Sequence, residues 1–335
     1  MKIVLDAMSG DNAPLEIVKG GIEAVLEYDC EVILAGDEQK INEILKECGQ
    51  IDNSKISVVA TNSVVDMCDE PNIVVREKRD SSMGVALDML ARGEADALVS
   101  AGNTGALLAG GTLIVKRIKG IRRAVLAATV PNAIKGGSII VDSGANVECT
   151  ADYLEQFAIM GDVYCKKALK KENPRIGLVN NGSEESKGSP MVKETYKLLE
   201  ENAKKGRLNF IGNIEGRDVA LGTADVIVTD GFTGNVLLKT YEGVGMYLSK
   251  EIKNMFMQNI FTKISAVFVN KGLNKLKKDM DYKETGGAPL LGIQKAIVKA
   301  HGSSDAYAIR SACRQVIAYK KSGTIEAITD EVAQK

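Results

Sequence analysis

The chain has 335 residues, of which 45% are hydrophobic and 26% charged, and its 43 basic and 44 acidic side chains leave a net charge of −1. This length is sufficient to bury a substantial core. The charge balance excludes a global positive field that would draw the protein to nucleic acid.

Short, continuously apolar runs rich in β-branched residues recur along the chain. Such runs are typical of strands that are buried on both faces of a largely parallel sheet. We therefore predict strands within residues 2–8, 30–37, 55–61, 97–102, 124–131, 137–144, 175–182, 208–214 and 226–231.

Helical patterns separate most of these runs. The first follows Pro14, which suits a first helical turn, and its apolar residues have helical spacing: Ile17, Val18, Ile22, Val25 and Leu26. The alternation predicts an α/β fold, a three-layer α/β/α sandwich with a largely parallel sheet. Because no Pro- or Ser-rich linker, repeat or low-complexity tract interrupts it, we expect one domain over residues 1–335.

Several predicted strands lead into a helix through a loop rich in Gly, Asn, Asp and Ser. These loops are residues 6–14, 100–109, 142–149, 180–190 and 230–239. Each alone is a common turn composition. In open α/β sheets, however, ligands bind at the carboxyl edge, so we expect these loops to line one cleft. Backbone N–H groups at helix starts suit a phosphate or an oxyanion, but no nucleotide-binding glycine motif is present.

Three residues are candidates for the chemistry. Lys187, followed by Gly188, is either a solvated surface charge or a cation for phosphate or a developing oxyanion. Asn235 either caps the following helix or donates its side-chain N–H to substrate. His301 is the only histidine. Because no GxSxG or reactive cysteine motif accompanies it, a Ser or Cys nucleophile has no support. We assign His301 either to substrate binding or to the support of residues that contact the substrate.

The sequence predicts no metal or other cofactor, since the strand-end aspartates, Asp230 among them, lack the spacing of a metal motif. The six cysteines show no CxxC pair, which is typical of reduced thiols in the cytosol. The first residues read as a strand and no run of apolar residues is long enough to span a bilayer. We therefore expect a cytoplasmic protein.

Residues 250–278 differ from the rest because they carry seven Lys and one Glu. In a helix, their large apolar side chains would share one face: Phe256, Met257, Ile260, Phe261, Ile264, Val267 and Phe268. Such a basic, amphipathic helical element over about 250–280 is either a core or dimer-interface helix, or a contact for a membrane or an acidic carrier protein.

Together, the motifs closely resemble the PlsX family, phosphate acyltransferases of phospholipid synthesis, in order from residue 1 to about 320. The resemblance rests on "DAMSGDNAP", "KRDSSM", "SAGNTGALLA", "DSGANVEC", "FIGNIEGRD", "DGFTGNVLLKT" and "GAPLLGIQKAIVKAHGSSDA". Three positions in two loops depart from the family pattern. The first loop has Ser9 and Asn12 where the family commonly has Gly and His, and Ser189 stands where Asn is more frequent.

The resemblance implies transfer of a fatty acyl group from acyl carrier protein to inorganic phosphate. It further implies a fold similar to isocitrate and isopropylmalate dehydrogenases, a homodimer, peripheral contact with the inner face of the cell membrane, and a membrane glycerol-3-phosphate acyltransferase as consumer of the product. Lys187 and Asn235 match the family's active-site residues.

We combine these inferences in one hypothesis. Phosphate binds at helix starts near Ser82, Asn103 and Thr104, Lys187 compensates its charge, and Asn235 polarises the thioester oxygen. Further substrate-binding candidates are Asn146, Asp230 and His301. The alternatives are a β-decarboxylating dehydrogenase on the same fold and a non-catalytic tether between carrier protein and membrane.

Overall fold

The computed structural model describes residues 1–134, 136–280 and 282–333, and only the backbone of 267, 273–280, 282 and 283. The strands are β1 Lys2–Asp6, β2 Glu31–Gly36, β3 Ile56–Ala60, β4 Ala97–Ser100, β5 Val125–Val130, β6 Ser138–Val141, β7 Arg175–Val179, β8 Asn209–Ile214, β9 Val226–Val228, β10 Gly287–Leu291 and β11 Ala296–Ala300. The helices are α1 Leu15–Glu27, α2 Glu38–Glu47, α3 Ser82–Arg92, α4 Thr104–Gly110, α5 Ala151–Lys167, α6 Pro190–Lys204, α7 Gly216–Leu221, α8 Gly231–Met257, α9 Ile260–Met280, α10 Tyr282–Thr285, α11 Ala306–Lys321 and α12 Thr324–Ala333, with short 3₁₀ and π segments at Pro71–Val75 and Gly111–Lys116.

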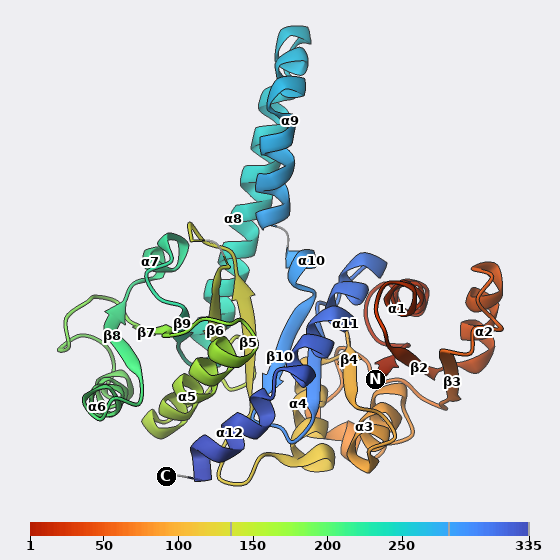
Figure 1. The fold of residues 1–335 in the computed structure, drawn as a ribbon, viewed down its shortest axis with the longest axis horizontal. Helices are drawn as coiled ribbons and strands as arrows, with labels where there is room; N and C mark the ends of the chain where they lie inside the picture. The colour runs from red at the N-terminus through yellow and green to blue at the C-terminus, as the bar shows by residue number, and fades with distance from the viewer. Residues whose placement is uncertain (135, 281, 334–335) are drawn as a thin grey trace.

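All strands join one sheet in the order β3-β2-β1-β4-β11-β10-β5-β6-β9-β7-β8 (Figure 1). Pairing is parallel on both sides of the centre. Antiparallel pairing occurs between β11 and β10, β10 and β5, and β5 and β6. The predicted α/β fold with a largely parallel sheet is therefore confirmed.

The antiparallel centre corrects one expectation about the loops. Three successive reversals make β6, β9 and β7 run opposite to β1 and β4. The loops after β1 and β4 therefore lie at one edge of the sheet, and those after β6, β7 and β9 at the other. The five loops therefore do not share one carboxyl edge, which would require parallel pairing throughout. Four of them nevertheless line one cleft, as expected, through Asp11, Thr104, Ser143 and Asn235.

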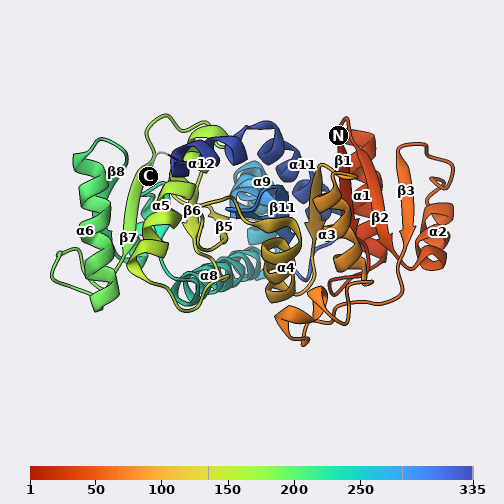
Figure 2. The same ribbon diagram turned by 90° about the horizontal axis from the view of Figure 1, so that it is seen from below.

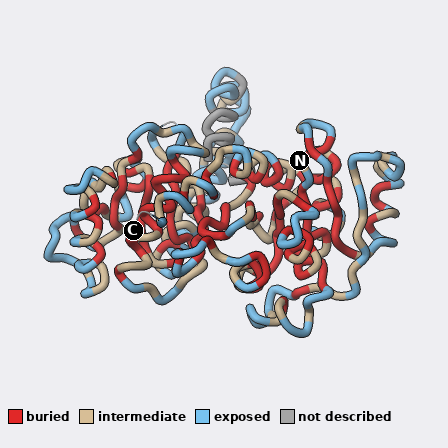
Figure 3. The backbone as a smooth tube through the Cα atoms, turned by 60° about the horizontal axis from the view of Figure 1, so that its bottom comes forward, coloured by how far each residue is buried: buried red, intermediate tan, exposed pale blue. Residues whose placement is uncertain are grey.

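Helices cover both faces of the sheet, and the alternation of side chains along the strands explains the layers (Figure 2). Ile3 and Leu5 of β1 point into the core beneath α1, α11 and α5, whereas Val4 points into the core beneath α3 and α4. A smaller cluster joins β6 and β9 to α7 and α8. Figure 3 shows the buried strands between these more exposed helices.

The predicted first helix is confirmed as α1, and Pro14 is its N-cap residue. Ile17, Val18, Ile22 and Val25 are buried, but Leu26 is 68% exposed, so it lies outside the apolar stripe. The sequence patterns predicted β1 to β9 but missed β10 and β11. These two strands carry Pro289 and Lys299, which weaken the apolar pattern of a buried strand.

The basic segment is a helical hairpin that projects from the sheet (Figure 1). The segment is helical, as predicted, but α8 ends at Met257 and α9 begins at Ile260, so its apolar side chains are divided between two helices. Phe261 and Phe268 are nevertheless 80% and 84% exposed, while the side chain of Val267 lies outside the described residues. None of the helices in the described part of the chain has the length and hydropathy of a membrane span.

Candidate active site

A cleft of about 800 Å³ lies over the central strands β5 and β10. Helix α8 forms one wall, and the loops after β1, β4 and β11 contribute the other, through Asp11, Thr104 and His301. The cleft therefore unites residues from both edges of the sheet, because α8, which follows β9, begins beside the loop after β6 and runs back along the sheet face. Tyr241 of α8 holds the helix against the segment after β5 by donating a hydrogen bond to the carbonyl oxygen of Pro131 at 2.6 Å.

One side of α8 supplies the wall over successive turns. Asn235, Lys239, Glu242, Met246 and Ser249 line the cleft at the three- and four-residue spacing of one helix face. The side chain of Asp230 caps the start of α8 by accepting a hydrogen bond from the Thr233 N–H at 2.9 Å. This face of the helix thus presents Asn235, Lys239 and Glu242 in its first half and Met246 and Ser249 in its second half.

The start of α8 packs so closely on the loop after β6 that glycine is required. A Cβ on Gly234 would lie 1.8 Å from the carbonyl oxygen of Asp142, and one on Gly231 would lie 2.6 Å from the carbonyl oxygen of Asn146. The two glycines of "DGFTGN" therefore allow the close packing that fixes Asn235 at the cleft, whereas Gly144 of "DSGAN" is favoured by its φ of +140°.

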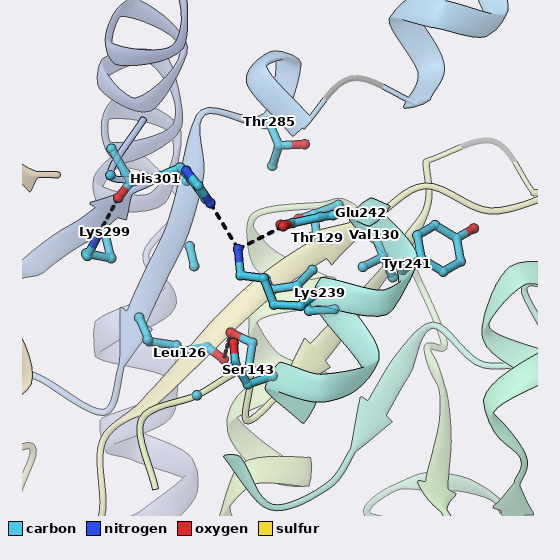
Figure 4. Close-up of a pocket in the computed structure, with 18 of the residues that line it drawn as sticks. Leu126, Thr129, Val130, Ser143, Lys239, Tyr241, Glu242, Thr285, Lys299 and His301 are labelled. Carbon is cyan, nitrogen blue, oxygen red and sulfur yellow. Dashed lines mark hydrogen bonds and ion pairs between the residues drawn. The ribbon is translucent and has the colours of Figure 1, made fainter. Parts of the chain in front are cut away.

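Lys239 has two partners, Glu242 on the same helix and His301 across the cleft (Figure 4). Its Nζ lies 2.8 Å from Glu242 Oε2 and 2.9 Å from His301 Nε2. Burial and the charge of Lys239 lower the pKa of His301, so the imidazole is neutral at pH 7. In the tautomer that carries its proton on Nδ1, the neutral ring accepts a hydrogen bond from the Lys239 ammonium at Nε2. Nδ1 lies 2.8 Å from the Ser303 hydroxyl.

Lys299 on β11 is a second cation at the cleft. Its Nζ donates to the carbonyl oxygens of Ala300 at 2.5 Å and Ala101 at 3.4 Å. Burial lowers the pKa of Lys299 to about 8, with Asp6 opposing the shift and Lys239 adding to it. The cleft therefore contains a partly buried ammonium that neutral oxygens solvate.

Asp6, the last residue of β1, connects this strand to two serines of other segments. Asp6 is fully buried and accepts hydrogen bonds from Ser82 Oγ at 2.5 Å and Ser100 Oγ at 2.7 Å. Further along, the Asn12 amide donates to the carbonyl oxygen of Ser304 at 3.2 Å. Asn12 therefore connects the loop after β1 to the segment after His301. An amide can do this without gaining or losing a proton, so the position does not require the histidine that is common in the family.

Three predicted substrate-binding residues are engaged with protein groups instead of lining the two clefts described here. Ser82 donates to Asp6. The Asn103 amide donates to the carbonyl oxygens of Asp66, Met67 and Asp69 at 3.2, 3.1 and 2.9 Å. The Asn146 amide donates to Asp142 at 2.9 Å and to the Ala124 carbonyl oxygen at 2.8 Å.

A second cleft, of about 510 Å³, lies between the loop after β7 and the start of α8. Asp230, Thr233, Gly188 and Ser189 line it. Lys187 is an exposed residue of the same loop, directly before Gly188, and does not line the larger cleft. Ser189 accepts a hydrogen bond from the Val192 N–H at 3.3 Å, so here it caps α6. The first turn of α8 thus separates Lys187 from the cleft that holds Asn235.

The structure therefore places Thr104, Asn235 and His301 of the predicted residues at the larger cleft. The sequence-based prediction missed Lys239, Glu242 and Lys299. A signal was available, since Lys239 follows Asn235 by one helical turn and Lys299 precedes His301 by two residues. Among the described residues, no group of three or more His, Cys, Asp or Glu side chains has the arrangement of a metal site.

Comparison with known proteins identifies the family. A family described as fatty acid synthesis protein matches residues 1–327. The "Phosphate acyltransferase" of Clostridioides difficile (strain 630) is 45% identical over 334 residues, covering 100% of this chain and 97% of the relative. That of Alkaliphilus oremlandii is 47% identical, covering 99% and 98%. The chain belongs to this family. The resemblance to the PlsX acyltransferases and the prediction of an enzyme are thereby confirmed.

Solved structures support the fold of this acyltransferase family member. A phosphotransacetylase from Streptococcus pyogenes matches with a TM-score of 0.64 and 18% identity, covering 95% of this chain and 94% of that one. A branched-chain phosphotransacylase from Enterococcus faecalis matches with a TM-score of 0.55 and 14% identity, covering 95% and 98%. At these identities the likeness shows the fold alone.

Proposed function

We propose that the protein transfers a fatty acyl group from acyl-acyl carrier protein to inorganic phosphate, producing acyl phosphate for phospholipid synthesis. The larger cleft carries this proposal, because it places the ammonium groups of Lys239 and Lys299 beside an apolar lining from β5 and α8. A phosphate needs the first environment and an acyl chain the second.

The reaction requires placement more than a strong base. An oxygen of HPO₄²⁻ attacks the thioester carbonyl carbon, the new C–O bond forms as the C–S bond breaks, and the departing thiolate takes the proton that phosphate carried. Asn235 donates its amide N–H to the carbonyl oxygen, where negative charge develops. Lys187 lies in an exposed loop outside the larger cleft, so in this proposal its flexible side chain moves toward the cleft to compensate the charge of the phosphate.

The remaining predicted residues fall into two groups, those that line the larger cleft and those that bind other protein groups. Thr104 and His301 line the cleft and bind substrate there. Ser82, Asn103, Asn146 and Asp230 use their side chains on protein groups, and in this proposal they position the loops and helix starts around the substrate. Residues 1–335 act as one catalytic domain.

The hairpin of α8 and α9 links the reaction to its partners. Its lysines attract the acidic carrier protein, and its exposed apolar side chains contact the inner face of the cell membrane. The protein works as a homodimer, and a membrane glycerol-3-phosphate acyltransferase consumes the acyl phosphate. The resemblance to the PlsX family supports these statements.

Incubation with acyl carrier thioester and inorganic phosphate tests the proposal. The enzyme should release the carrier thiol only when phosphate is present. A protein that binds the carrier without releasing thiol would act as a tether.

A further inference from the structure

We infer that Lys239 and Lys299 together form the phosphate subsite of the larger cleft. The inference rests on the proposed function for the identity of the anion, and it adds two residues that neither the motifs nor the comparisons assign. The two lysines come from opposite halves of the sheet, since Lys239 lies on α8 and Lys299 on β11.

Lys239 lines the cleft, and one N–H group of its ammonium is available to a ligand. An ammonium group has three N–H donors, of which Glu242 and His301 accept two. The side chain is 48% exposed, so a ligand in the cleft can reach it. Its position one helical turn after Asn235 places its charge beside the amide that polarises the carbonyl oxygen.

The ammonium group of Lys299 hydrogen-bonds to carbonyl oxygens and, in the described part of the chain, has no negatively charged partner in contact with it. The nearby Asp6 accepts from Ser82 and Ser100, and Lys299 forms no ion pair with a carboxylate among the described residues. A partly buried charge without a counter-ion is costly. The lowered pKa of Lys299 reflects this cost, and a bound phosphate dianion would remove it.

The other charged groups of the cleft favour the same arrangement. Glu242 is paired with Lys239, and His301 is neutral, so these two orient the ammonium. Asp11 lies beside Gly302, at the edge formed by the first loop. Lys299 therefore remains the cation that attracts an anion into the cleft.

Two variants and one control test the inference. Lys299→Met and Lys239→Met remove the charges, and Lys295→Met removes a lysine at the other end of β11. We expect each cleft variant to raise the KM for phosphate by about tenfold or more, with the KM for the acyl carrier thioester changed by less than about twofold. Inorganic phosphate alone should raise the melting temperature of the wild type and of Lys295→Met, but not of the cleft variants.

The outcomes separate this inference from the proposed function. If both folded cleft variants keep the wild-type KM for phosphate and its thermal effect, the inference is wrong. A rise in the KM for the carrier thioester alone would also overturn it, because the lysines would then bind the phosphodiester of the carrier's prosthetic arm. The cleft variants could lose the rise in melting temperature that phosphate causes, while the wild type releases no thiol. This result would support the phosphate subsite and refute the proposed function. If Lys299→Met does not fold, Lys239→Met decides.

Discussion

The Nζ of Lys239 lies 2.9 Å from His301 Nε2, although 62 positions separate the two residues in the chain. This contact joins the wall of α8 to the segment after β11, and thereby couples the two halves of the sheet across the cleft. It depends on a neutral imidazole, which burial and the ammonium itself favour. The lone histidine thus serves to orient a cation.

Phosphate binding should weaken at alkaline pH because Lys299 loses its charge there. The pKa of Lys299 is about 8, so its ammonium is present below this pH and lost above it. Asp6 and Asp11 favour the ammonium, and Lys239 opposes it. We expect the KM for phosphate to rise about tenfold per pH unit above this pKa. Lys299→Arg stays charged and should flatten the profile; an unchanged slope in this variant would exclude Lys299.

Lys187→Ala should greatly lower acyl phosphate formation while the fold remains intact. Lys187 is exposed, so its loss removes charge without leaving a cavity. We expect a fall in kcat of about 100-fold or more, measured as thiol release, with an unchanged circular dichroism spectrum. Lys193→Ala, an exposed lysine of α6, is the matched control. Near-normal turnover by Lys187→Ala would remove this residue from the mechanism.

Ser82→Ala should lower stability more than phosphate affinity. The substitution removes the 2.5 Å hydrogen bond to the buried Asp6 carboxylate. We expect the free energy of unfolding to fall by about 1–3 kcal/mol, with the KM for phosphate within about twofold of wild type. Ser63→Ala breaks the exposed hydrogen bond to Asp80 and should cost about 0.5 kcal/mol or less. A large rise in KM with normal stability would instead restore Ser82 to direct substrate binding.

Phe261→Ser and Phe268→Ser should weaken binding to anionic lipid vesicles. Both phenyl groups are more than three-quarters exposed, at 80% and 84%, so transfer into lipid would bury apolar area. We expect about a tenfold loss of vesicle affinity per substitution in a sedimentation assay, without a change in melting temperature. Leu221→Ser on α7, where the side chain is 62% exposed, is the control. Equal vesicle binding by all four proteins would exclude this membrane contact.

Local patterns predicted the fold well where the interactions are local. Continuous apolar runs predicted β1 to β9, and glycine-rich strand ends predicted the starts of several helices. The reversal of the sheet was not predictable in this way, because it depends on pairing between β5 and β10, which are far apart in the chain. Similarly, Asn235 was recognisable from its motif, but Lys239 and Lys299 resemble surface lysines until packing places them at one cleft.

In the proposed reaction, orthophosphate itself attacks the acyl thioester. Turnover of acyl carrier thioester with phosphate in which all four oxygens are ¹⁸O, followed by mass spectrometry of the product, tests this step. We predict acyl phosphate that retains four labelled oxygens, formed in equal amount to the released carrier thiol. Release of free fatty acid without labelled acyl phosphate would contradict the account.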